Sequence, residues 1–236
     1  MFIVNNENEI GSIEFNNSKK IFFSKNIRRI RPDILWEKSP VEEFVVEDGN
    51  KFLKAVDGVI FSANGEDLIL FPRTKKGEYV VPNGVKTIKS TAFHSSELTS
   101  IKFNEDLETI EQYAFTSSKL ESSEFPRNCK IKVIKCEVFA GTNIKNICLP
   151  SSLESIGQRG FYHCKSLKEI TISANIKILS AFALAGCESL AKVTIEGAET
   201  KIDKYAFTHC FNLKEVISPC SSTLKKVLNS IQPITE

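Results

Sequence analysis

The sequence predicts a right-handed solenoid that is mainly β, in which short turns of chain stack on one another along most of the 236 residues. Two observations predict it. A nine-residue phrase recurs along the chain, and an alternating apolar pattern, typical of a strand with one buried face, opens most copies. A unit of about 23 residues cannot bury its own apolar side, whereas stacked units cover one another.

The recurring phrase reads "IEQYAFTSS" at 110–118, "IGQRGFYHC" at 156–164 and "IDKYAFTHC" at 202–210. Its central anchor residues recur every 22 to 24 residues: Phe93, Phe115, Phe139, Phe161, Leu184 and Phe207. An aliphatic residue lies five positions before each anchor: Ile88, Ile110, Ile134, Ile156, Leu179 and Ile202. A small residue lies three positions after it: Ser96, Ser118, Thr142, Cys164, Cys187 and Cys210.

Each unit is expected to contribute two strands. An opening set of the form Leu-x-x-Ile-x-Ile, as at 98–103, 167–172 and 190–195, alternates with period two and predicts the longer strand. The "I-x-x-x-A-F" stretch predicts a second, short strand followed by a tight turn. The units should therefore form a long parallel sheet on one face of the solenoid and a shorter sheet on another.

The two ends of the chain depart from the repeat. Asp57-Gly58 and Asn64-Gly65 flank the apolar runs at 59–61 and 68–71, which predicts β-hairpins within 41–82. Residues 26–35 resemble a diverged repeat. At the other end, "SSTLKKVLNSIQ" at 221–232 has a serine N-cap and apolar residues at helical spacing, which predicts a helix that covers the last turn.

The repeat over residues 83–217 resembles the BspA-like leucine-rich repeat of bacterial and protist proteins, many of them surface-associated. The copy at 125–142 is the most degenerate, with Val138 in place of alanine. Residues 41–82 resemble the hairpin module that these proteins insert between repeats. The resemblance implies a leucine-rich-repeat solenoid in a single domain: a diverged repeat or cap at 1–40, the insert at 41–82, repeats at 83–217 and a cap at 218–236.

The composition limits which cellular locations and which classes of partner we expect. The net charge of +2 favours neither nucleic acid nor an anionic membrane. No apolar run reaches the roughly 18 residues of a membrane span, and too few apolar residues precede Asn5 for a signal peptide. The odd count of seven cysteines, without a CxxC pair, fits a reducing compartment. We therefore expect a cytoplasmic protein without membrane insertion, while the family resemblance offers the cell surface as the alternative.

No catalytic or metal-binding set can be assembled from the sequence, so we expect no enzyme, no metal and no cofactor. His163 and His209 recur in the same register but two turns apart, about 10 Å, too far to share a zinc ion bound at about 2 Å. Cys164, Cys187 and Cys210 fill a position that takes only small residues. They are interpreted as packing residues, with a disulfide between neighbours as the alternative.

A column of alternating charge should run along the short strands: Lys86, Glu108, Lys132, Glu154 and Lys177. Opposite charges on neighbouring strands stabilise a sheet slightly. Arg28 should lie at the head of this column. The basic run that it forms with Arg29 and Arg31 is therefore interpreted mainly as a solvent-exposed part of the charged column with a structural role. Its alternative role is binding of phosphate, a lipid headgroup or nucleic acid.

The outward positions of the long strands form the candidate protein-binding face, because they have no packing role in the repeat. They are Ser100, Lys102, Ser122, Glu124, Asn146, Glu169, Thr171, Lys192 and Thr194. The leading hypothesis is a non-catalytic protein that binds protein partners through this face. A structural scaffold inside a larger, for example cytoskeletal, assembly and a cell-surface adhesion or antigen protein are the alternatives.

Overall fold

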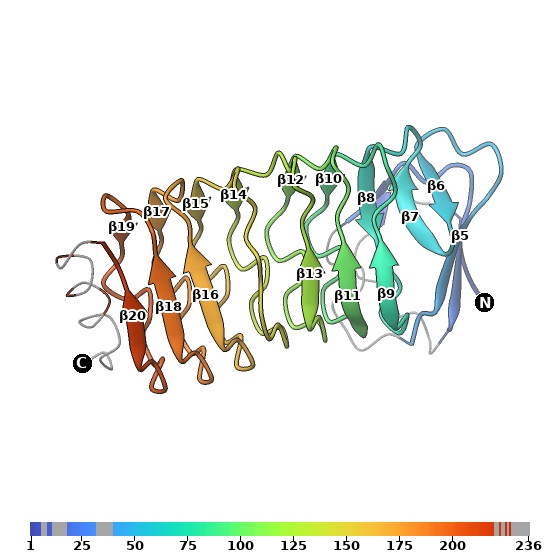
Figure 1. Cartoon of the computed structure of the whole chain (residues 1–236). Coiled ribbons are helices and arrows are strands. Elements are labelled where there is room, and N and C mark those ends of the chain that lie inside the picture. The colour runs from blue at the N-terminus through green and yellow to red at the C-terminus, as the bar shows by residue number, and fades with distance from the viewer. Residues whose placement is uncertain are drawn as a thin grey trace.

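The computed structural model describes residues 1–5, 9–10, 18–31 and 40–219, together with Ser222, Lys225 and Val227. Within these ranges the chain is a mainly β solenoid with almost no helix, and strands β5 (Glu43–Val46) and β20 (Glu215–Ile217) lie near opposite ends of an elongated stack (Figure 1). The sequence-based expectation of stacked turns with strands on two faces is therefore confirmed.

The long strands lie on one face of the solenoid (Figure 1). Three parallel, three-stranded sheets follow one another there. They comprise β1 (Phe2–Val4), β3 (Lys20–Phe23) and β5 (Glu43–Val46); β9 (Gly77–Val80), β11 (Leu98–Lys102) and β13 (Ser122–Glu124); and β16 (Glu169–Ile172), β18 (Lys192–Ile195) and β20 (Glu215–Ile217). The turn that follows the degenerate copy contributes only an isolated bridge from Asn146 to Glu169, so the strand expected there is reduced to one pairing.

The short strands form the second set. β8 (Asp67–Leu70), β10 (Thr87–Ile88) and β12 (Thr109–Ile110) pair in parallel, as do β14 (Val133–Ile134), β15 (Ser155–Ile156), β17 (Ile178–Leu179) and β19 (Lys201–Ile202). Near the N-terminus, β2 (Glu9–Ile10) pairs with β4 (Arg29–Ile30). The aliphatic residue of each repeat ends its short strand, and all of these residues are buried in the core except Ile202, which is half-buried.

An antiparallel meander interrupts the stack between the N-terminal turns and the repeats. β6 (Leu53–Val56) pairs with β7 (Val59–Ser62), and β7 pairs with β8. Asp57 and Gly58 both have positive φ, 49° and 77°, which is the backbone of the tight hairpin turn that Asp-Gly favours. β8 then returns to parallel pairing with β10.

The meander corrects one expectation, because it separates Arg28 from the charged column. Glu66, which lies just before β8, occupies the place beside Lys86, with 2.5 Å between Lys86 Nζ and Glu66 Oε1. Farther along, Lys132 and Glu154 form the expected pair at 3.0 Å. The alternating column thus begins at the meander rather than at the N-terminal turns.

The anchor phenylalanines stack in the middle of the solenoid. Ring centroids are 4.6 Å apart for Phe71 and Phe93, 4.7 Å for Phe93 and Phe115, 5.4 Å for Phe115 and Phe139, and 5.3 Å for Phe139 and Phe161. All five rings are buried. Leu184 interrupts the ladder by one turn, and Phe207 resumes the anchor column beyond it, also fully buried.

The turns around the anchors are tied together by backbone hydrogen bonds. The amide of each anchor donates to the carbonyl of the residue that precedes the next anchor, as from Phe93 to Ala114 at 2.8 Å and from Phe161 to Ala183 at 2.8 Å. Those alanines are buried with no exposed surface. The same bond forms to Val138 at 2.9 Å, so this buried position takes alanine, valine or, at Gly160, glycine.

The column of small residues is also buried. Cys164, Cys187 and Cys210 are free thiols without exposed surface. Each Sγ donates to the carbonyl of the anchor one turn earlier, at 3.1 Å to Phe139, 3.2 Å to Phe161 and 3.1 Å to Leu184. Burial raises the pKa of the Cys187 thiol. These cysteines pack and hydrogen-bond in the core, and none of the three is in a disulfide.

The predicted capping helix at 221–232 lies largely outside the described residues, as does Leu35 of the diverged N-terminal repeat. Within 221–232 the structure describes Ser222 and Lys225, which are exposed, and Val227, which is fully buried as part of the main core. The Val227 side chain therefore packs against the core beyond the last strand.

Replacing Phe161 with alanine should destabilise the protein by about 3–5 kcal/mol, because the rigid stack of turns cannot close the cavity left by the ring. Phe211→Ala is the matched control. Its ring is 67% exposed, so its removal should change stability by no more than about 0.5 kcal/mol. Urea titration followed by circular dichroism measures both, and equal midpoints for the two variants would show that the anchor column is misplaced.

Candidate functional site

The outward residues of the long strands form two parallel rows. In the first row Ser100 lies between Glu78 and Ser122, and Glu169 is paired in turn with Lys192. In the second row Lys102 lies between Val80 and Glu124, and Thr171 is paired with Thr194. Of the nine candidate residues, Ser122, Glu124, Asn146, Glu169 and Thr171 are exposed, and the other four are half-buried.

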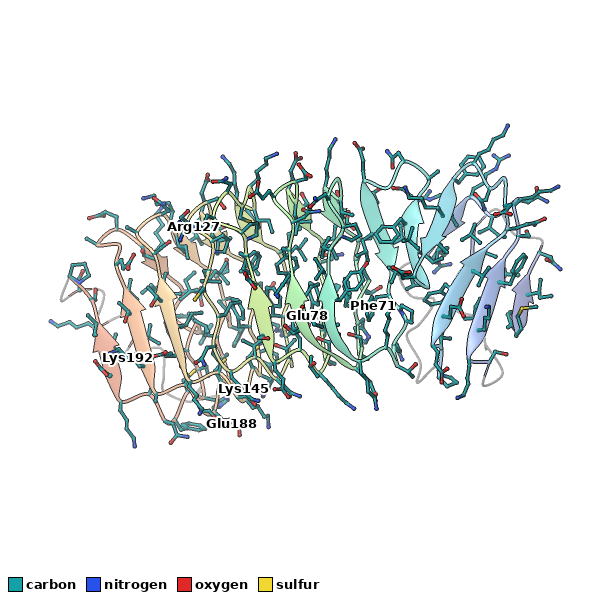
Figure 2. The ribbon with its side chains drawn as sticks, turned by 45° about the vertical axis from the view of Figure 1, so that its right-hand side comes forward. Phe71, Glu78, Arg127, Lys145, Glu188 and Lys192 are labelled. Carbon is teal, nitrogen blue, oxygen red and sulfur yellow. The ribbon has the colours of Figure 1, made fainter. Side chains whose placement is uncertain are left out.

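The charges of this face are paired along the solenoid. Lys102 lies 3.2 Å from Glu78, and Lys192 lies 3.0 Å from Glu215. Figure 2 shows Glu78 and Lys192 on this sheet face near opposite ends of the repeats. Because these pairs are exposed, each contributes at most about 1 kcal/mol. The face is an even polar surface, with exposed Val80 and Ile217 toward its two ends.

The basic residues Arg28, Arg29 and Arg31 lie at the N-terminal turns and are all exposed. They line a groove of about 440 Å³ together with Phe52 and the beginning of the meander. The guanidinium carbon of Arg28 lies 5.4 Å from the centre of the Phe52 ring. Glu9 is the cross-strand neighbour of Arg29. The groove is thus a cationic surface close to an aromatic ring.

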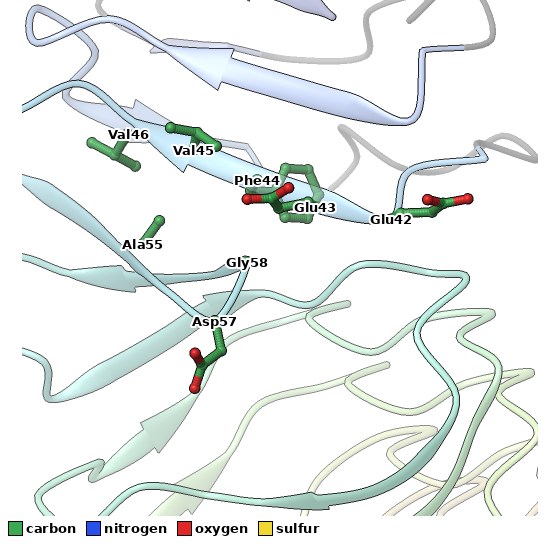
Figure 3. Close-up of a pocket in the computed structure, with 8 residues that line it drawn as sticks. All are labelled: Glu42, Glu43, Phe44, Val45, Val46, Ala55, Asp57 and Gly58. Carbon is green, nitrogen blue, oxygen red and sulfur yellow. The ribbon is translucent and has the colours of Figure 1, made fainter.

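A cleft of about 560 Å³ opens where β5 meets the β6–β7 turn (Figure 3). Glu42 and Glu43 line one side and Asp57 the other. The two glutamates are already paired, Glu42 with Lys19 at 2.8 Å and Glu43 with Lys20 at 3.1 Å. The remaining lining is aliphatic or backbone, and neither a nucleophile nor a histidine borders the cleft. Its two glutamates therefore serve ion pairs between turns.

A pair of basic side chains, buried Arg73 and half-buried His94, joins the meander to the first repeat. Arg73 is 6% exposed, and its Nη2 lies 3.5 Å from Nδ1 of His94. Burial lowers the pKa of the Arg73 guanidinium to about 10. Burial, together with the nearby Arg73 charge, lowers the pKa of His94 to about 4. His94 is therefore neutral at physiological pH and belongs to the packing between turns.

Among the described residues, no three His, Cys, Asp or Glu side chains are grouped so that they could hold a metal ion. His163 is half-buried at one turn and His209 is exposed two turns later. Burial is the main cause that lowers the pKa of His163.

The sequence did not lead us to predict one surface feature, a row of stacked side chains. Arg159, Phe182 and Tyr205 occupy the position two residues before successive anchors, a position that takes a different residue in nearly every repeat. In the structure, Phe182 and Tyr205 stack at 5.3 Å, and Arg159 lies 5.7 Å from the Phe182 ring. Aromatic residues at neighbouring copies of one outward position were the signal that could have revealed this row.

Comparison with known proteins agrees with the repeat architecture. The family described as BspA type leucine rich repeat region (6 copies) matches residues 70–135 and 132–231. The chain belongs to this family of BspA-type repeats. A comparison with curated proteins finds no match.

Solved structures show the same fold as this BspA-type chain. The pneumococcal vaccine antigen PcpA is similar with a TM-score of 0.77 and 25% identity, over 98% of this chain and 57% of PcpA. A leucine rich cell surface protein from Faecalibacterium prausnitzii has a TM-score of 0.63 and 26% identity, over 92% of this chain and 52% of its own. The T. pallidum leucine rich repeat protein, at 23% identity and a TM-score of 0.57, covers 72% of this chain and 81% of its own. This chain spans little more than half the length of the first two.

In the described part of the chain, no helix has the length and hydropathy needed to cross a membrane.

The depressed pKa of His94 predicts a loss of stability in acid. Because the pKa falls from 6.5 to about 4 on folding, neutral His94 contributes fully above pH 6.5, and the contribution is lost as pH falls through about 4. Since His94 is only half-buried, solvent screening should limit the effect to about 1–2 kcal/mol. Urea midpoints between pH 7.5 and 4 should fall less for His94→Asn than for the parent.

His209→Asn serves as the control, because its side chain is exposed at an equivalent turn. That variant should follow the parent profile. If His94→Asn also followed it, the burial of a neutral His94 would be contradicted.

Proposed function

We propose that this chain is a non-catalytic interaction protein that binds a protein partner across its long-strand face. The observation that carries the proposal is the pair of outward rows on β9 to β20, which run along successive turns and have no packing role. Solenoids characteristically use such extended surfaces for binding. The short polar residues of the rows favour a broad, wet contact over a small apolar one.

The repeat organisation favours a rigid binding surface over a flexible linker. Successive turns share one core, and their charges are paired from turn to turn, so the outward rows keep a fixed spacing. A rigid surface loses little conformational entropy on binding. We further propose that residues 41–82 act as the insert module between the N-terminal turns and the repeats, and that residues 218–236 form the cap.

Two locations remain candidates under this proposal. The described cysteines are free thiols, which favours a reducing, intracellular compartment and a scaffold role. Similarity to the pneumococcal vaccine antigen and to a cell surface protein favours display outside the cell and a role in adhesion. Counting reactive thiols in denatured protein from its natural source separates them, because full reactivity supports the intracellular candidate.

The binding face can be tested with two multiple variants. Alanine at Lys102, Glu124, Asn146, Glu169 and Lys192 should reduce recovery of crosslinked partners at least about tenfold, because the substitutions remove the polar contacts of the face. Glutamate at Arg28, Arg29 and Arg31 should leave recovery unchanged. Crosslinking in cells of the source organism, followed by mass spectrometry, provides the measurement.

Both variants should unfold at nearly the parental urea midpoint, since neither set belongs to the core. The reverse outcome, in which the arginine variant loses the partners and the face variant retains them, would move the site to the N-terminal groove. That groove, with its cations beside Phe52, is the second candidate surface and would then bind an anion.

A further inference from the structure

A second hollow borders the N-terminal groove that Arg28, Arg29 and Arg31 line. It has a volume of about 630 Å³ and shares Arg28 and Phe52 with the groove. The described residues that line it are Lys25, Asn26, Arg28, Gly49, Lys51 and Phe52. This lining supplies three cationic side chains and no carboxylate.

The cations of this region lack the partners that cations have elsewhere in the solenoid. The described ion pairs join a cation to a carboxylate about one turn away, as Lys86 does with Glu66. Lys89, at the edge of the groove, follows this rule and pairs with Glu111 at 2.8 Å. The lining side chains that form no ion pair with a described residue include Lys25, Arg28, Arg29 and Lys51.

The excess of positive charge remains when every nearby carboxylate is counted. Apart from the Lys89–Glu111 pair, five cations line the two hollows: Lys25, Arg28, Arg29, Arg31 and Lys51. Asp67 is the other carboxylate among the described lining residues. Glu47 and Asp48 precede Gly49 in the chain, and Glu9 is the cross-strand neighbour of Arg29. The five cations thus outnumber the four carboxylates, and the second hollow itself contains only cations.

Arg28 and Lys51 are held on neighbouring turns. Nδ2 of Asn50 donates to the carbonyl of Ile27 at 3.0 Å, and Oδ1 of Asn50 accepts the Phe52 amide at 2.8 Å. These bonds place Lys51 one turn beyond Arg28, whose guanidinium carbon lies 5.4 Å from the Phe52 ring centre. Like charges on neighbouring turns repel each other. An anion that contacts both side chains would relieve this repulsion.

Cations from two turns favour a phosphate group over a carboxylate. A phosphate monoester carries almost two negative charges near pH 7 and three strong acceptor oxygens, so it can contact Arg28 and Lys51 together. A carboxylate has one charge and two oxygens, which a single guanidinium satisfies. The planar fork of arginine also matches the geometry of phosphate oxygens, and lysines add point charges around it.

The dimensions of the region favour a compact ligand over a nucleic acid strand. Single strands are bound by several aromatic side chains on which successive bases stack. Phe52 is the aromatic side chain among the described lining residues, and Arg28 already lies over its ring. The chain from Arg28 to Arg31 spans at most about 10 Å, which suits a ligand with a few neighbouring phosphate groups.

We propose that the N-terminal groove and the adjoining hollow form one site for a compact ligand rich in phosphate groups. Arg28 and Lys51 contact the phosphate oxygens, and Lys25 and Arg29 add positive charge around them. A soluble phosphate ester and the headgroup of a phosphorylated lipid share this chemistry. The site acts in addition to the long-strand face and does not depend on the function proposed for that face.

Calorimetric titration of the full chain with pyrophosphate at low salt tests the proposal. Citrate, which has a similar charge at pH 7, is the carboxylate control and should bind more weakly. Arg28→Ala with Lys51→Ala should weaken pyrophosphate binding at least about tenfold, because hydrogen bonds to charged groups are lost. Lys177→Ala with Lys201→Ala removes the same charge from exposed lysines outside the site and should bind like the parent. Arg28→Lys should also weaken binding, because it keeps the charge but loses the planar fork.

Sedimentation with phosphatidylcholine vesicles, with and without phosphatidic acid, distinguishes the two sources of phosphate. Retention that requires phosphatidic acid and is lost in the Arg28→Ala, Lys51→Ala variant would support the site with a lipid headgroup as its ligand. Calorimetric binding of pyrophosphate without retention on vesicles would support the site with a soluble phosphate ester as its ligand.

Several results would overturn the proposal. They are no binding of pyrophosphate, equally tight binding of citrate, equal losses for the two double variants, or tighter binding of a single-stranded oligothymidylate. The Arg28→Ala, Lys51→Ala variant removes two exposed like charges, so its urea midpoint without ligand should not fall below that of the parent. A lower midpoint would contradict the repulsion on which the site rests. The five-alanine variant of the long-strand face should bind pyrophosphate like the parent, so failure of one proposal is distinguishable from failure of the other.

Discussion

The structure depends on one constraint: every turn must present to the next the same hydrogen-bonding groups and the same apolar positions that it receives from the previous one. The described ion pairs follow this constraint, because all twelve join residues 20 to 24 positions apart, one turn away. The amides of the anchors obey it too. Since a single turn can satisfy neither its polar groups nor its apolar side alone, fold and stability arise between neighbours.

The constraint explains why some positions of the repeat tolerate no variation. The residue three after the anchor is buried, and only Ser, Thr or Cys occurs there; the three cysteines donate to a carbonyl of the previous turn, as Cys187 does. Positions two residues before and after the anchors adopt positive φ in most turns, even where the residue is Phe182 or His163. Hydrogen bonds between turns offset that local strain.

Much of the fold could be predicted from the sequence, because the core positions are the ones that repeat. The anchors and the aliphatic residues before them recur at fixed spacing, and the structure buries them with the exception of half-buried Ile202. The place of Arg28 could not be predicted, since the register across the antiparallel meander depends on how β6 to β8 pair. Contacts on the surface were harder to predict, because the residue type at an outward position, such as that of Arg159 or Phe182, changes from one repeat to the next. Their contacts exist only once successive turns are stacked.

Removal of one whole turn tests the central claim most directly. Deletion of the 23 residues 180–202 joins Leu179 to Asp203, which takes the place of Ser180 and should donate to the carbonyl of Ile156 as Ser180 does. We expect this protein to unfold in one cooperative urea transition, with a slightly lower midpoint and a smaller slope that reflects the lost surface. Deletion of residues 180–197, which breaks the register, should abolish the cooperative transition. If both deletions unfolded alike, the claim that contacts between equivalent positions of neighbouring turns determine the fold would be wrong.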